Sequence, residues 1–356
     1  MKKIQVAING FGRIGRTVCR VMLQKKNINI VAINDLHDSL TLAHLFKYDS
    51  IHGVYDGKIN HGKNFISING KKINIYSEKD PKKLPWKNLN IDVVIESTGL
   101  YLDSANAKKH LEAGAKKVII SAPSKGNDIK SVVLGVNENI LSKEDKIISN
   151  VSCTTNCAAP MIKVLDENWG VENAYISTVH SYTSNQQLHD VPHKDLRRAR
   201  AAAISIIPTS TGAAKAITKI FPHLEGKIGG CGIRVPVPNG SLTDISCILK
   251  KDTTVEKINN AFRKASQTSL KGILQYNEDP IVSVDIIGNP YSCILDAGFT
   301  SVVGKIVKVI GWYDNEVGYS NRLAELVEKM GIMLKFGPTF LITKLNTKVK
   351  SSPKFK

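Results

Sequence analysis

The chain has 356 residues, 42% of them hydrophobic and 22% charged, which predicts a globular protein of two domains. It contains no apolar run of about 18 residues that could span a membrane, and no signal peptide follows the opening Met-Lys-Lys. Its net charge is +18, but the lysines form no basic stripe with interleaved aromatic residues, so we expect neither a membrane nor a nucleic acid as the primary partner.

The first half of the chain alternates short β-branched runs with amphipathic stretches. Strands are predicted at "IQVAIN", "NIVAIN", "IDVVIEST", "KVIISA" and "SVVLGV", and helices over residues 13–24 and 104–114. This alternation indicates a parallel, doubly wound sheet. The run "FISINGKKINIY" differs, because Asn69 and Gly70 predict the tight turn of a β-hairpin.

The second half has longer strand patterns that follow one another without regular helical crossovers. They are "NAYISTVHSY", "GCGIRVPVP", "LTDISCIL", "IVSVDIIG" and "GKIVKVIGWYDN", with helices expected near residues 153–168, 213–221 and 255–269. Such an order predicts an α+β domain with a mostly antiparallel sheet and helices on one face.

The change of pattern places a domain boundary near residue 150. We expect a first domain over residues 1–151 and a second, catalytic domain over residues 152–316. A C-terminal helix within residues 317–336 should pack on the first domain. Residues 337–356 carry five lysines, two prolines and no acidic residue, which predicts an extended basic tail on the surface.

A glycine motif directly follows the first predicted strand and opens the first helix. In "AINGFGRIG" the glycines stand at Gly10, Gly12 and Gly15, where they allow a tight turn, close approach of backbone to a pyrophosphate, and helix–strand packing. Asp35 ends the next predicted strand, where a carboxylate accepts hydrogen bonds from ribose hydroxyls and repels a 2′-phosphate. The pattern predicts a Rossmann-type domain that binds NAD in preference to NADP.

Two of the six cysteines, Cys153 and Cys157, lie close together in "SNVSCTTNCAAP". No further metal ligands stand nearby, so we expect no metal site, and a disulfide between positions i and i+4 would distort a helix. The scattered cysteines of so large a chain indicate reduced thiols in the cytoplasm.

The two thiols differ in their expected positions on a helix. Cys153 should lie in the first turn, where the helix dipole and free N–H groups stabilise a thiolate and can hold an oxyanion or a phosphate. Cys157, one turn further among small apolar residues, is expected to be packing. For Cys153 the residues alone leave two possibilities open, a buried thiol and a nucleophile.

The stretch "NVSCTTNCAAP" resembles the active-site signature of phosphorylating glyceraldehyde-3-phosphate dehydrogenases. Five further stretches resemble this family in its own order: "INGFGRIGR", "LAHLFKYDSIHG", "HSYTSNQQLHDVPHKDLRRARAAA", "IIPTSTGAAKAI" and "WYDNEVGYSNR". The resemblance implies oxidation of glyceraldehyde 3-phosphate with NAD and inorganic phosphate to 1,3-bisphosphoglycerate, in glycolysis or gluconeogenesis. The intermediates it implies are a thiohemiacetal and an acyl thioester.

The resemblance also implies roles for individual residues. Cys153 matches the family's nucleophile and His180 its base, and a neighbouring imidazolium would lower the pKa of the thiol. The residues that match the anion sites are Thr183 and Arg198 for the sugar phosphate, Ser152, Thr154, Thr211 and Gly212 for inorganic phosphate, and Arg234 between the two. The residues that match cofactor contacts are Gly10, Gly12, Arg13, Ile14 and Gly15 at the pyrophosphate, Asp35 at the ribose, Lys79 and Ser121 near the adenine, and Asn315 at the nicotinamide amide.

Four positions bear on how closely the chain follows the family. Val191 and Pro192 stand where NADP-using plastid relatives carry small polar residues, which again favours NAD. Asn185 replaces an aspartate of many bacterial members, and Val317 stands where tryptophan is frequent.

Two other functions are compatible with parts of the sequence. Erythrose-4-phosphate dehydrogenases share the cysteine–histidine pair but diverge after "IIP", where this chain keeps "IIPTSTGAAKAI". The basic surface and tail could also serve an interaction protein with secondary binding of nucleic acid. The resemblance further implies a homotetramer in which the segment 181–208 lies near a neighbour's cofactor site.

Overall fold

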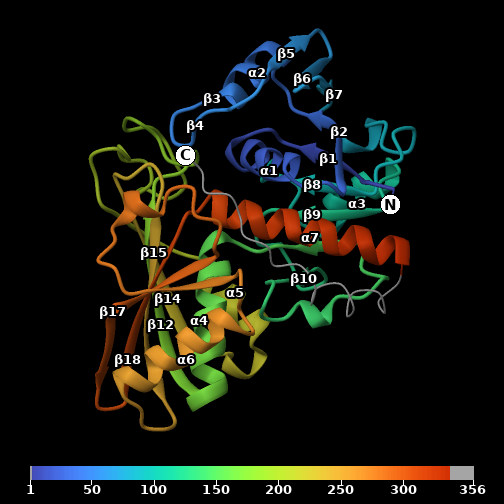
Figure 1. Ribbon diagram of the computed structural model, residues 1–356. Coiled ribbons are helices and arrows are strands. Elements are labelled where there is room, and N and C mark those ends of the chain that lie inside the picture. Colours follow the sequence, from blue (N-terminus) through green and yellow to red (C-terminus); the bar gives the residue numbers. More distant parts are fainter. Residues whose placement is uncertain (1, 337–356) are drawn as a thin grey trace. The chain divides into compact units, whose positions relative to one another are not determined.

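The computed structural model describes residues 2–336 of the chain, and Figure 1 shows their helices and strands. These residues form two compact units. The first contains the described residues up to Val132, then Asn139–Asn150 and the helix residues from Ser320 on; the second contains Val133–Glu138 and Val151–Tyr319. The expected basic tail lies outside the described residues.

The first unit is built on a nine-stranded sheet of order β10-β11-β9-β8-β1-β2-β7-β6-β5. Strands β10 to β7 of this order pair in parallel, and β5, β6 and β7 pair antiparallel. The strands are β1 (Ile4–Asn9), β2 (Ile28–Asn34), β5 (Ile59–Gly62), β6 (Phe65–Ile68), β7 (Lys71–Tyr76), β8 (Val93–Glu96), β9 (Lys117–Ile120), β10 (Lys130–Ser131) and β11 (Ile147–Ser149). The predicted hairpin is confirmed at β6 and β7, where Asn69 and Gly70 both have positive φ.

Helices and one small sheet complete this unit. The helices are α1 (Arg13–Leu23), α2 (Ser39–Lys47) and α3 (Ser104–Glu112). Short 3-10 turns lie at Pro81–Lys83 and at Glu138–Ile140, and the second of them begins in the second unit. Strands β3 (Tyr48–Asp49) and β4 (Gly53–Val54) pair with each other. The central strand β1 has Val6, Ala7 and Ile8 fully buried, as expected for a parallel strand covered on both faces.

The second unit has a seven-stranded sheet of order β13-β14-β12-β15-β18-β17-β16. Four of its six pairings are antiparallel, so the predicted mixed α/β fold class is confirmed. The strands are β12 (Val171–Ser181), β13 (Ile207–Thr209), β14 (Ile228–Val235), β15 (Ser241–Leu249), β16 (Leu274–Asn277), β17 (Cys293–Val303) and β18 (Ile306–Tyr313).

Helices α4 (Cys153–Trp169), α5 (Ala213–Ile220) and α6 (Val255–Gln267) pack against this sheet (Figure 1). Alternate residues of β15, among them Thr243, Ile245 and Cys247, are buried, while those between them are partly exposed. One face of the sheet therefore carries the core of this unit. A 3-10 turn at Pro222–Leu224 follows α5.

The last helix, α7 (Val317–Phe336), begins in the second unit and continues in the first. There Leu323, Val327 and Met330 are fully buried, and Glu328 forms an ion pair with Lys25 after α1 at 2.5 Å. No helix in the described part of the chain is long and apolar enough to cross a membrane.

Two strands predicted from the sequence are wrong. Of "SVVLGV" only Ser131 belongs to a strand, because the chain then turns at Gly135, whose φ is +81°, and Asn137 accepts a hydrogen bond from the Val133 N–H. Strand β11, which the prediction missed, pairs with β10 there.

The run "IVSVDIIG" forms a 3-10 turn, Ser283–Ile286, in place of the second predicted strand. The Asp285 carboxylate accepts a hydrogen bond from the Val282 N–H and so closes this turn. Val282 and Val284 are exposed, so the β-branched pattern here does not correspond to a buried strand.

Candidate functional site

The glycine motif of the first unit forms the turn between β1 and α1. Gly10 has a φ of +92°, and a Cβ placed on Gly15 would lie 2.1 Å from the Gly10 carbonyl oxygen, so both positions exclude larger residues. A Cβ on Gly12, the N-cap of α1, would meet nothing within 4 Å. The turn therefore packs tightly on one side and leaves its backbone open on the other, which fits a pyrophosphate at the start of α1.

Asp35 lies directly after β2, beside this turn. Its Oδ2 accepts from the Phe11 N–H at 2.8 Å, and its Oδ1 accepts from the His37 N–H at 3.1 Å. Burial raises the pKa of Asp35, but the hydrogen bonds from His37 and Phe11 outweigh it, so the pKa lies below its ordinary value. A charged carboxylate at this strand end fits a ribose and repels a 2′-phosphate.

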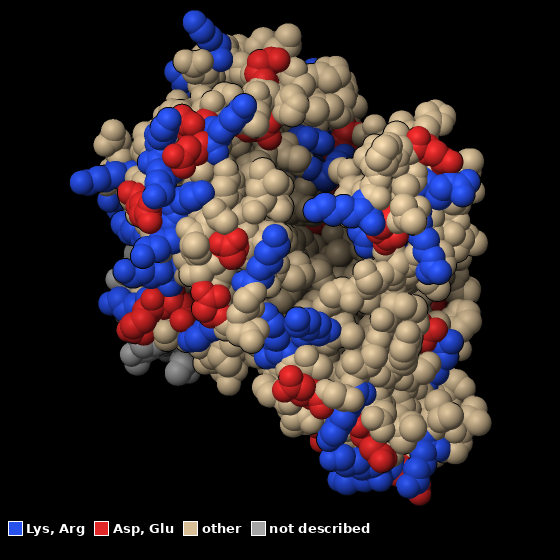
Figure 2. Space-filling model, turned by 180° about the vertical axis from the view of Figure 1, so that it is seen from behind, with Lys and Arg blue, Asp and Glu red and all other residues tan. Residues whose placement is uncertain are grey.

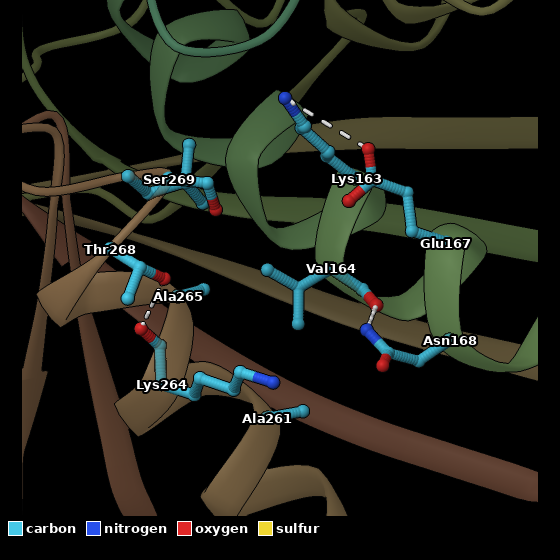
Figure 3. Close-up of a pocket in the computed structure, with 10 residues that line it drawn as sticks. Lys163, Val164, Glu167, Asn168, Ala261, Lys264, Ala265, Thr268 and Ser269 are labelled. Atoms are coloured by element: carbon cyan, nitrogen blue, oxygen red, sulfur yellow. Dashed lines mark hydrogen bonds and ion pairs between the residues drawn. The ribbon is translucent and has the colours of Figure 1, made fainter.

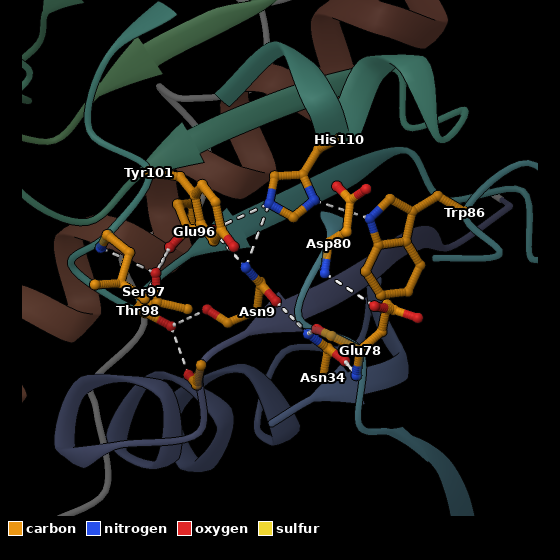
Figure 4. A network of polar contacts seen from close by, with 12 residues as sticks. Asn9, Asn34, Glu78, Asp80, Trp86, Glu96, Ser97, Thr98, Tyr101 and His110 are labelled. Carbon is orange, nitrogen blue, oxygen red and sulfur yellow. Dashed lines mark hydrogen bonds and ion pairs between the residues drawn. The ribbon is translucent and has the colours of Figure 1, made fainter. Parts of the chain in front are cut away.

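A buried polar network that sequence reasoning missed joins the ends of β1, β2 and β8 (Figure 4). Glu96 Oε2 accepts from Asn9 Nδ2 at 2.6 Å and lies 3.0 Å from His110 Nε2, and Glu96 Oε1 accepts from the Thr98 N–H at 2.8 Å. Because the Trp86 indole can only donate, its contact with His110 Nδ1 at 3.0 Å places the histidine proton on Nε2, facing Glu96.

Hydrogen bonds connect this network to the glycine turn and support it. Asn34 Nδ2 donates to Asn9 Oδ1 at 2.7 Å, and Ser97 Oγ donates to the Gly10 carbonyl at 2.7 Å. The participants are too far apart in sequence to suggest a cluster. Only the sheet order, which places β1 between β2 and β8, could have pointed to it.

The other cofactor residues predicted for this unit are distributed as follows. Lys79 and Ser121 follow β7 and β9, so they lie at the same carboxyl edge of the parallel strands. Ile14 is in the first turn of α1. The Arg13 guanidinium forms an ion pair with Asp49 at 2.7 Å.

In the second unit, helix α4 begins at Cys153. The Ser152 hydroxyl caps the helix by accepting from the Thr155 N–H at 3.0 Å, and Cys153 Sγ lies 3.4 Å from His180 Nε2 at the end of β12. Cys157 is fully buried, with its thiol 3.6 Å from the Gly311 carbonyl, as a packing residue would be. The two cysteines thus have different surroundings, and only Cys153 lies beside a base.

Burial acts against the thiolate and imidazolium that the family resemblance implies for the Cys153–His180 pair. Burial raises the pKa of Cys153 to about 11, although the charge of Arg234 and the Thr154 N–H act in the opposite direction. Burial, reinforced by the charge of Arg234, lowers the pKa of His180 to about 3. Desolvation of both groups therefore opposes a charged pair, whereas the N–H groups at the start of α4 favour the thiolate.

Arg234, on β14, is in direct contact with His180. Its Nη1 lies 2.7 Å from His180 Nδ1 and donates to the Ser181 carbonyl at 2.8 Å. Tyr313, on β18, meets the His180 ring edge to face, with ring centroids 5.9 Å apart. The Tyr313 hydroxyl also contacts Thr154 Oγ1 at 2.9 Å, so the start of α4 is tied to β18.

The predicted sugar-phosphate residues lie in the segment between β12 and β14. Arg198 Nε donates to Thr209 Oγ1 at 2.8 Å, and Thr209 Oγ1 donates to Asp195 Oδ2 at 3.0 Å. Thr183 Oγ1 donates to Asn185 Oδ1 at 2.8 Å. The amide oxygen of Asn185 therefore accepts the hydrogen bond that a carboxylate oxygen of an aspartate at this position would accept. Asp195 and Thr209, which orient Arg198, were missed by the sequence analysis.

The predicted residues for inorganic phosphate come from the starts of two helices. Ser152 and Thr154 belong to the start of α4, and Gly212 is the N-cap of α5. Thr211 Oγ1 accepts from the Ala213 N–H at 3.2 Å, which shapes the turn into α5.

Asn315, the predicted nicotinamide contact, has a fixed amide orientation. Its Oδ1 accepts from Ser181 Oγ at 2.9 Å, from Ser241 Oγ at 2.9 Å and from the Gly240 N–H at 3.2 Å. A backbone N–H can only donate, so the atom facing Gly240 must be the oxygen, and the amide nitrogen is left as a donor. A donor fits the carbonyl oxygen of a carboxamide such as that of NAD.

A separate cavity of about 160 Å³ lies against α4 and α6 (Figure 3). Lys163 and Glu167 line it from α4, and Ala261 and Lys264 line it from α6. None of its lining residues is a candidate catalytic or binding residue. Within the described chain, no group of three or more His, Cys, Asp or Glu side chains could hold a metal ion.

Figure 2 shows Lys and Arg side chains over one face of the molecule with Asp and Glu among them. The positive charge on this face is therefore mixed with negative charge, and the observation favours no nucleic-acid surface.

The fold and these sites define a class of protein: a two-domain, nucleotide-dependent dehydrogenase with a cysteine–histidine pair. Residues 4–104 match the family model of "Glyceraldehyde 3-phosphate dehydrogenase, NAD binding domain", and residues 152–315 match that of "Glyceraldehyde 3-phosphate dehydrogenase, C-terminal domain".

Similar proteins cover nearly the whole chain. It is 55% identical over 327 residues to the glyceraldehyde-3-phosphate dehydrogenase of Thermotoga maritima, covering 91% of this chain and 98% of that protein. It is 52% identical over 334 residues to glyceraldehyde-3-phosphate dehydrogenase 2 of Streptomyces avermitilis, covering 93% and 99%. The chain belongs to the glyceraldehyde-3-phosphate dehydrogenase family, and it is an NAD-dependent oxidoreductase.

Proposed function

We propose that this chain oxidises glyceraldehyde 3-phosphate to 1,3-bisphosphoglycerate with NAD and inorganic phosphate, in glycolysis or gluconeogenesis. The observation that carries the proposal is the position of the Cys153 thiol, which lies at the start of helix α4 and 3.4 Å from His180 Nε2. A nucleophile beside a base is the arrangement that covalent aldehyde chemistry requires. The basic side chains of Arg198 and Arg234 suit a substrate that carries phosphate.

The first step joins the substrate to Cys153. The Cys153 sulfur forms a bond to the aldehyde carbon while His180 Nε2 takes the thiol proton and returns it to the carbonyl oxygen, which gives a thiohemiacetal. The N–H groups of Cys153 and Thr154, in the first turn of α4, are available to stabilise the developing negative charge on that oxygen.

The second step is the oxidation. NAD, when bound, supplies the acceptor for the hydride. As the carbon loses its hydride, His180 Nε2 takes the hydroxyl proton, and the carbon–oxygen double bond of an acyl thioester forms on Cys153. Asn315 would orient the carboxamide of NAD through the amide nitrogen that its three donors leave free.

The third step transfers the acyl group to phosphate. A phosphate oxygen bonds to the acyl carbon, the carbon–sulfur bond breaks, and His180 gives its proton back to the Cys153 sulfur. Ser152, Thr154, Thr211 and Gly212 are proposed to hold this phosphate, supported by the helix N-termini at α4 and α5. Retention of these residues favours phosphate over water as the acceptor and so disfavours an erythrose-4-phosphate dehydrogenase.

The test is NADH formation by the purified chain, with and without added inorganic phosphate. Glyceraldehyde 3-phosphate should support turnover that depends on phosphate and should be used better than erythrose 4-phosphate. NADH formation that proceeds equally well without phosphate would show that water is the acceptor and would overturn the proposal.

We further propose that the enzyme is a homotetramer. Leu188, Leu196, Ile204 and Ile206 in the segment after β12 are 75%, 81%, 84% and 70% exposed in the single chain. Apolar side chains gathered on one segment are typical of a surface that another protein covers. Light scattering on the purified protein should give four times the mass of one chain, and a stable monomer would contradict this assembly.

We also propose that the protein works in the cytoplasm. All six cysteines have free thiols in the structure, and a reducing compartment keeps them so. Rapid alkylation of cells before lysis should modify the accessible thiols without prior reduction, and recovery of disulfide-linked cysteines would contradict this location.

A further inference from the structure

Arg198, in the segment between β12 and β14, makes its contacts along one edge of its guanidinium. Nε donates to Thr209 Oγ1 at 2.8 Å, and Nη2 donates to the Ser210 carbonyl oxygen at 3.4 Å. Nε–H and one Nη2–H point to the same side of this planar group, so the two contacts occupy that side together. The other edge, formed by Nη1 and the second hydrogen of Nη2, has no hydrogen bond or ion pair with any of residues 2–336.

The Thr209 hydroxyl that holds Arg198 is itself oriented by a carboxylate. A guanidinium can only donate, so Thr209 Oγ1 accepts from Arg198 and gives its single proton to Asp195 Oδ2 at 3.0 Å. Asp195 is held in turn, because its Oδ1 accepts from the Arg197 N–H at 3.0 Å. Partial burial raises the pKa of Asp195, but the hydrogen bonds from Thr209 and Arg197 outweigh it, so the pKa lies below its ordinary value. The carboxylate is therefore charged at neutral pH and fixes the direction of the hydroxyl.

The sheet of the second unit holds Thr209 in place. Thr209 is the last residue of β13 and lies directly opposite Gly232 of β14, two residues before Arg234. Its side chain is buried. Arg198 lies outside the strands, but through Thr209 it takes its direction from the same pair of strands that carries Arg234.

Arg198 needs such an anchor because its neighbours carry or oppose positive charge. Burial lowers the pKa of His180 and of Arg234, and the charge of Arg198 acts in the same direction on both. Arg198 therefore lies close enough to these two groups for its charge to act on them. Two guanidinium groups repel each other, so a long side chain without an anchor would turn away from Arg234. The contact with Thr209 opposes that movement.

We propose that Thr209, oriented by Asp195, is a positioning residue that presents the free edge of Arg198 to the phosphate group of the aldehyde substrate. The inference deepens the proposed function and rests on it. A phosphate that meets this edge receives two parallel hydrogen bonds, from Nη1 and Nη2, which fix its direction as well as neutralise its charge. Thr209 thereby contributes to the preference for a phosphorylated aldehyde without touching the substrate.

The test compares glyceraldehyde 3-phosphate with glyceraldehyde, which has the aldehyde and no phosphate. Thr209→Val keeps the shape of the side chain and removes the hydroxyl. The ratio of the two kcat/KM values should therefore fall by about tenfold, mainly through a higher KM for the phosphorylated substrate. Thr209→Ser keeps the hydroxyl and should restore most of the ratio. Equal losses with both substrates would show a merely structural role and would overturn the proposal.

Two comparisons show whether Thr209 acts through Arg198. Ser210→Ala is the matched control, because it removes a neighbouring exposed hydroxyl and leaves the carbonyl that accepts from Arg198, so it should keep the wild-type ratio. In the Arg198→Gln background, Thr209→Val should change the ratio no further. A loss in Ser210→Ala as large as that in Thr209→Val, or a full additional loss in the double variant, would overturn the proposal.

Calorimetric titration separates the two sources of phosphate. Glycerol 3-phosphate, a three-carbon phosphate without an aldehyde, should bind Thr209→Val about tenfold more weakly than wild type, whereas inorganic phosphate should bind the two proteins equally. A change confined to inorganic phosphate would assign the free edge of Arg198 to the second anion and would overturn the proposal.

Failure of this inference can be told from failure of the proposed function. If the wild type forms NADH in a phosphate-dependent reaction and Thr209→Val keeps the wild-type substrate ratio, this inference alone is refuted. If the wild type does not oxidise glyceraldehyde 3-phosphate, the proposed function fails. The binding of glycerol 3-phosphate then decides by itself whether Thr209 positions Arg198 for a sugar phosphate.

Discussion

The sulfur of Cys153 and the Nε2 atom of His180 lie 3.4 Å apart, although one residue begins helix α4 and the other lies near the end of strand β12. Packing of α4 against the sheet of the second unit brings them together. The distance is suited to proton transfer, and the burial of both groups favours their neutral forms. The pair is therefore poised for chemistry that begins with a thiol and a base.

Replacing Cys153 by Ser should abolish oxidation without preventing cofactor binding. A hydroxyl is a far weaker nucleophile than a thiol in the same place, so turnover should fall by at least about a thousandfold. Steady-state NADH formation measures the loss, and calorimetric titration with NAD measures binding. Cys157→Ala is the matched control, because this buried packing cysteine lies on the same helix; it should keep most of the activity. Substantial turnover by the Cys153→Ser variant would remove the nucleophile assignment.

Replacing Asp35 by Asn should weaken the preference for NAD over NADP. The amide keeps an oxygen for the Phe11 N–H but loses the negative charge that repels a 2′-phosphate, so the ratio of kcat/KM values should change by about tenfold or more. Kinetics with both cofactors provide the measurement. An unchanged ratio would mean that other residues, such as Val191 and Pro192, set the preference.

The pH dependence of NAD binding follows from the same carboxylate. Since the pKa of Asp35 lies below its ordinary value, its charge is present at neutral pH and is lost only as the pH falls toward that low pKa. The dissociation constant of NAD should therefore show no Asp35-dependent change between about pH 5 and pH 9. The comparison of wild type with Asp35→Asn isolates this contribution. A transition near neutrality that disappears in the variant would contradict the depressed pKa.

Replacing Ser241 by Ala should weaken NAD binding. It removes one of the three donors that hold the Asn315 oxygen, a loss of about 1 kcal/mol or about fivefold in affinity. Ser246→Ala on the same strand is the control, because Ser246 lies on the opposite face of β15. If both variants bind NAD like the wild type, Asn315 does not depend on this support.

Replacing Glu96 by Gln should destabilise the first unit. The new amide would turn a donor toward groups that already donate to Glu96, namely Asn9, Thr98 and His110, at a cost of about 1–3 kcal/mol in the free energy of unfolding. Urea unfolding measures the cost. Glu112→Gln, which breaks only the exposed pair with Lys82, should change stability by less than about 0.5 kcal/mol. Equal effects of the two substitutions would argue against the network.

The sequence predicted those elements whose signals are local. The glycine turn before α1, the β6–β7 hairpin and the start of α4 at Cys153 each depend on a few adjacent residues with a clear steric or capping role. Local patterns failed at "IVSVDIIG", because a β-branched run can form an exposed turn when a single side chain, Asp285, caps it.

Contacts between distant segments could not be read from the sequence. The register of β12 with β14, which sets His180 against Arg234, and the gathering of Asn9, Glu96 and His110 depend on which strands become neighbours. Helix position argues for a thiolate at Cys153, and only the fold reveals the burial that opposes it. Selection of His180 from nine histidines came from family resemblance.

The most direct test of the proposed chemistry is to trap the acyl group on the protein. The enzyme is mixed with NAD and glyceraldehyde 3-phosphate in the absence of inorganic phosphate, quenched in acid and analysed by peptide mass spectrometry. We predict a phosphoglyceroyl group on the peptide of Cys153, absent from Cys153→Ser and discharged when inorganic phosphate is added before the quench. Rapid NADH formation with an unmodified Cys153, or an acyl group on another residue, would contradict a mechanism through Cys153.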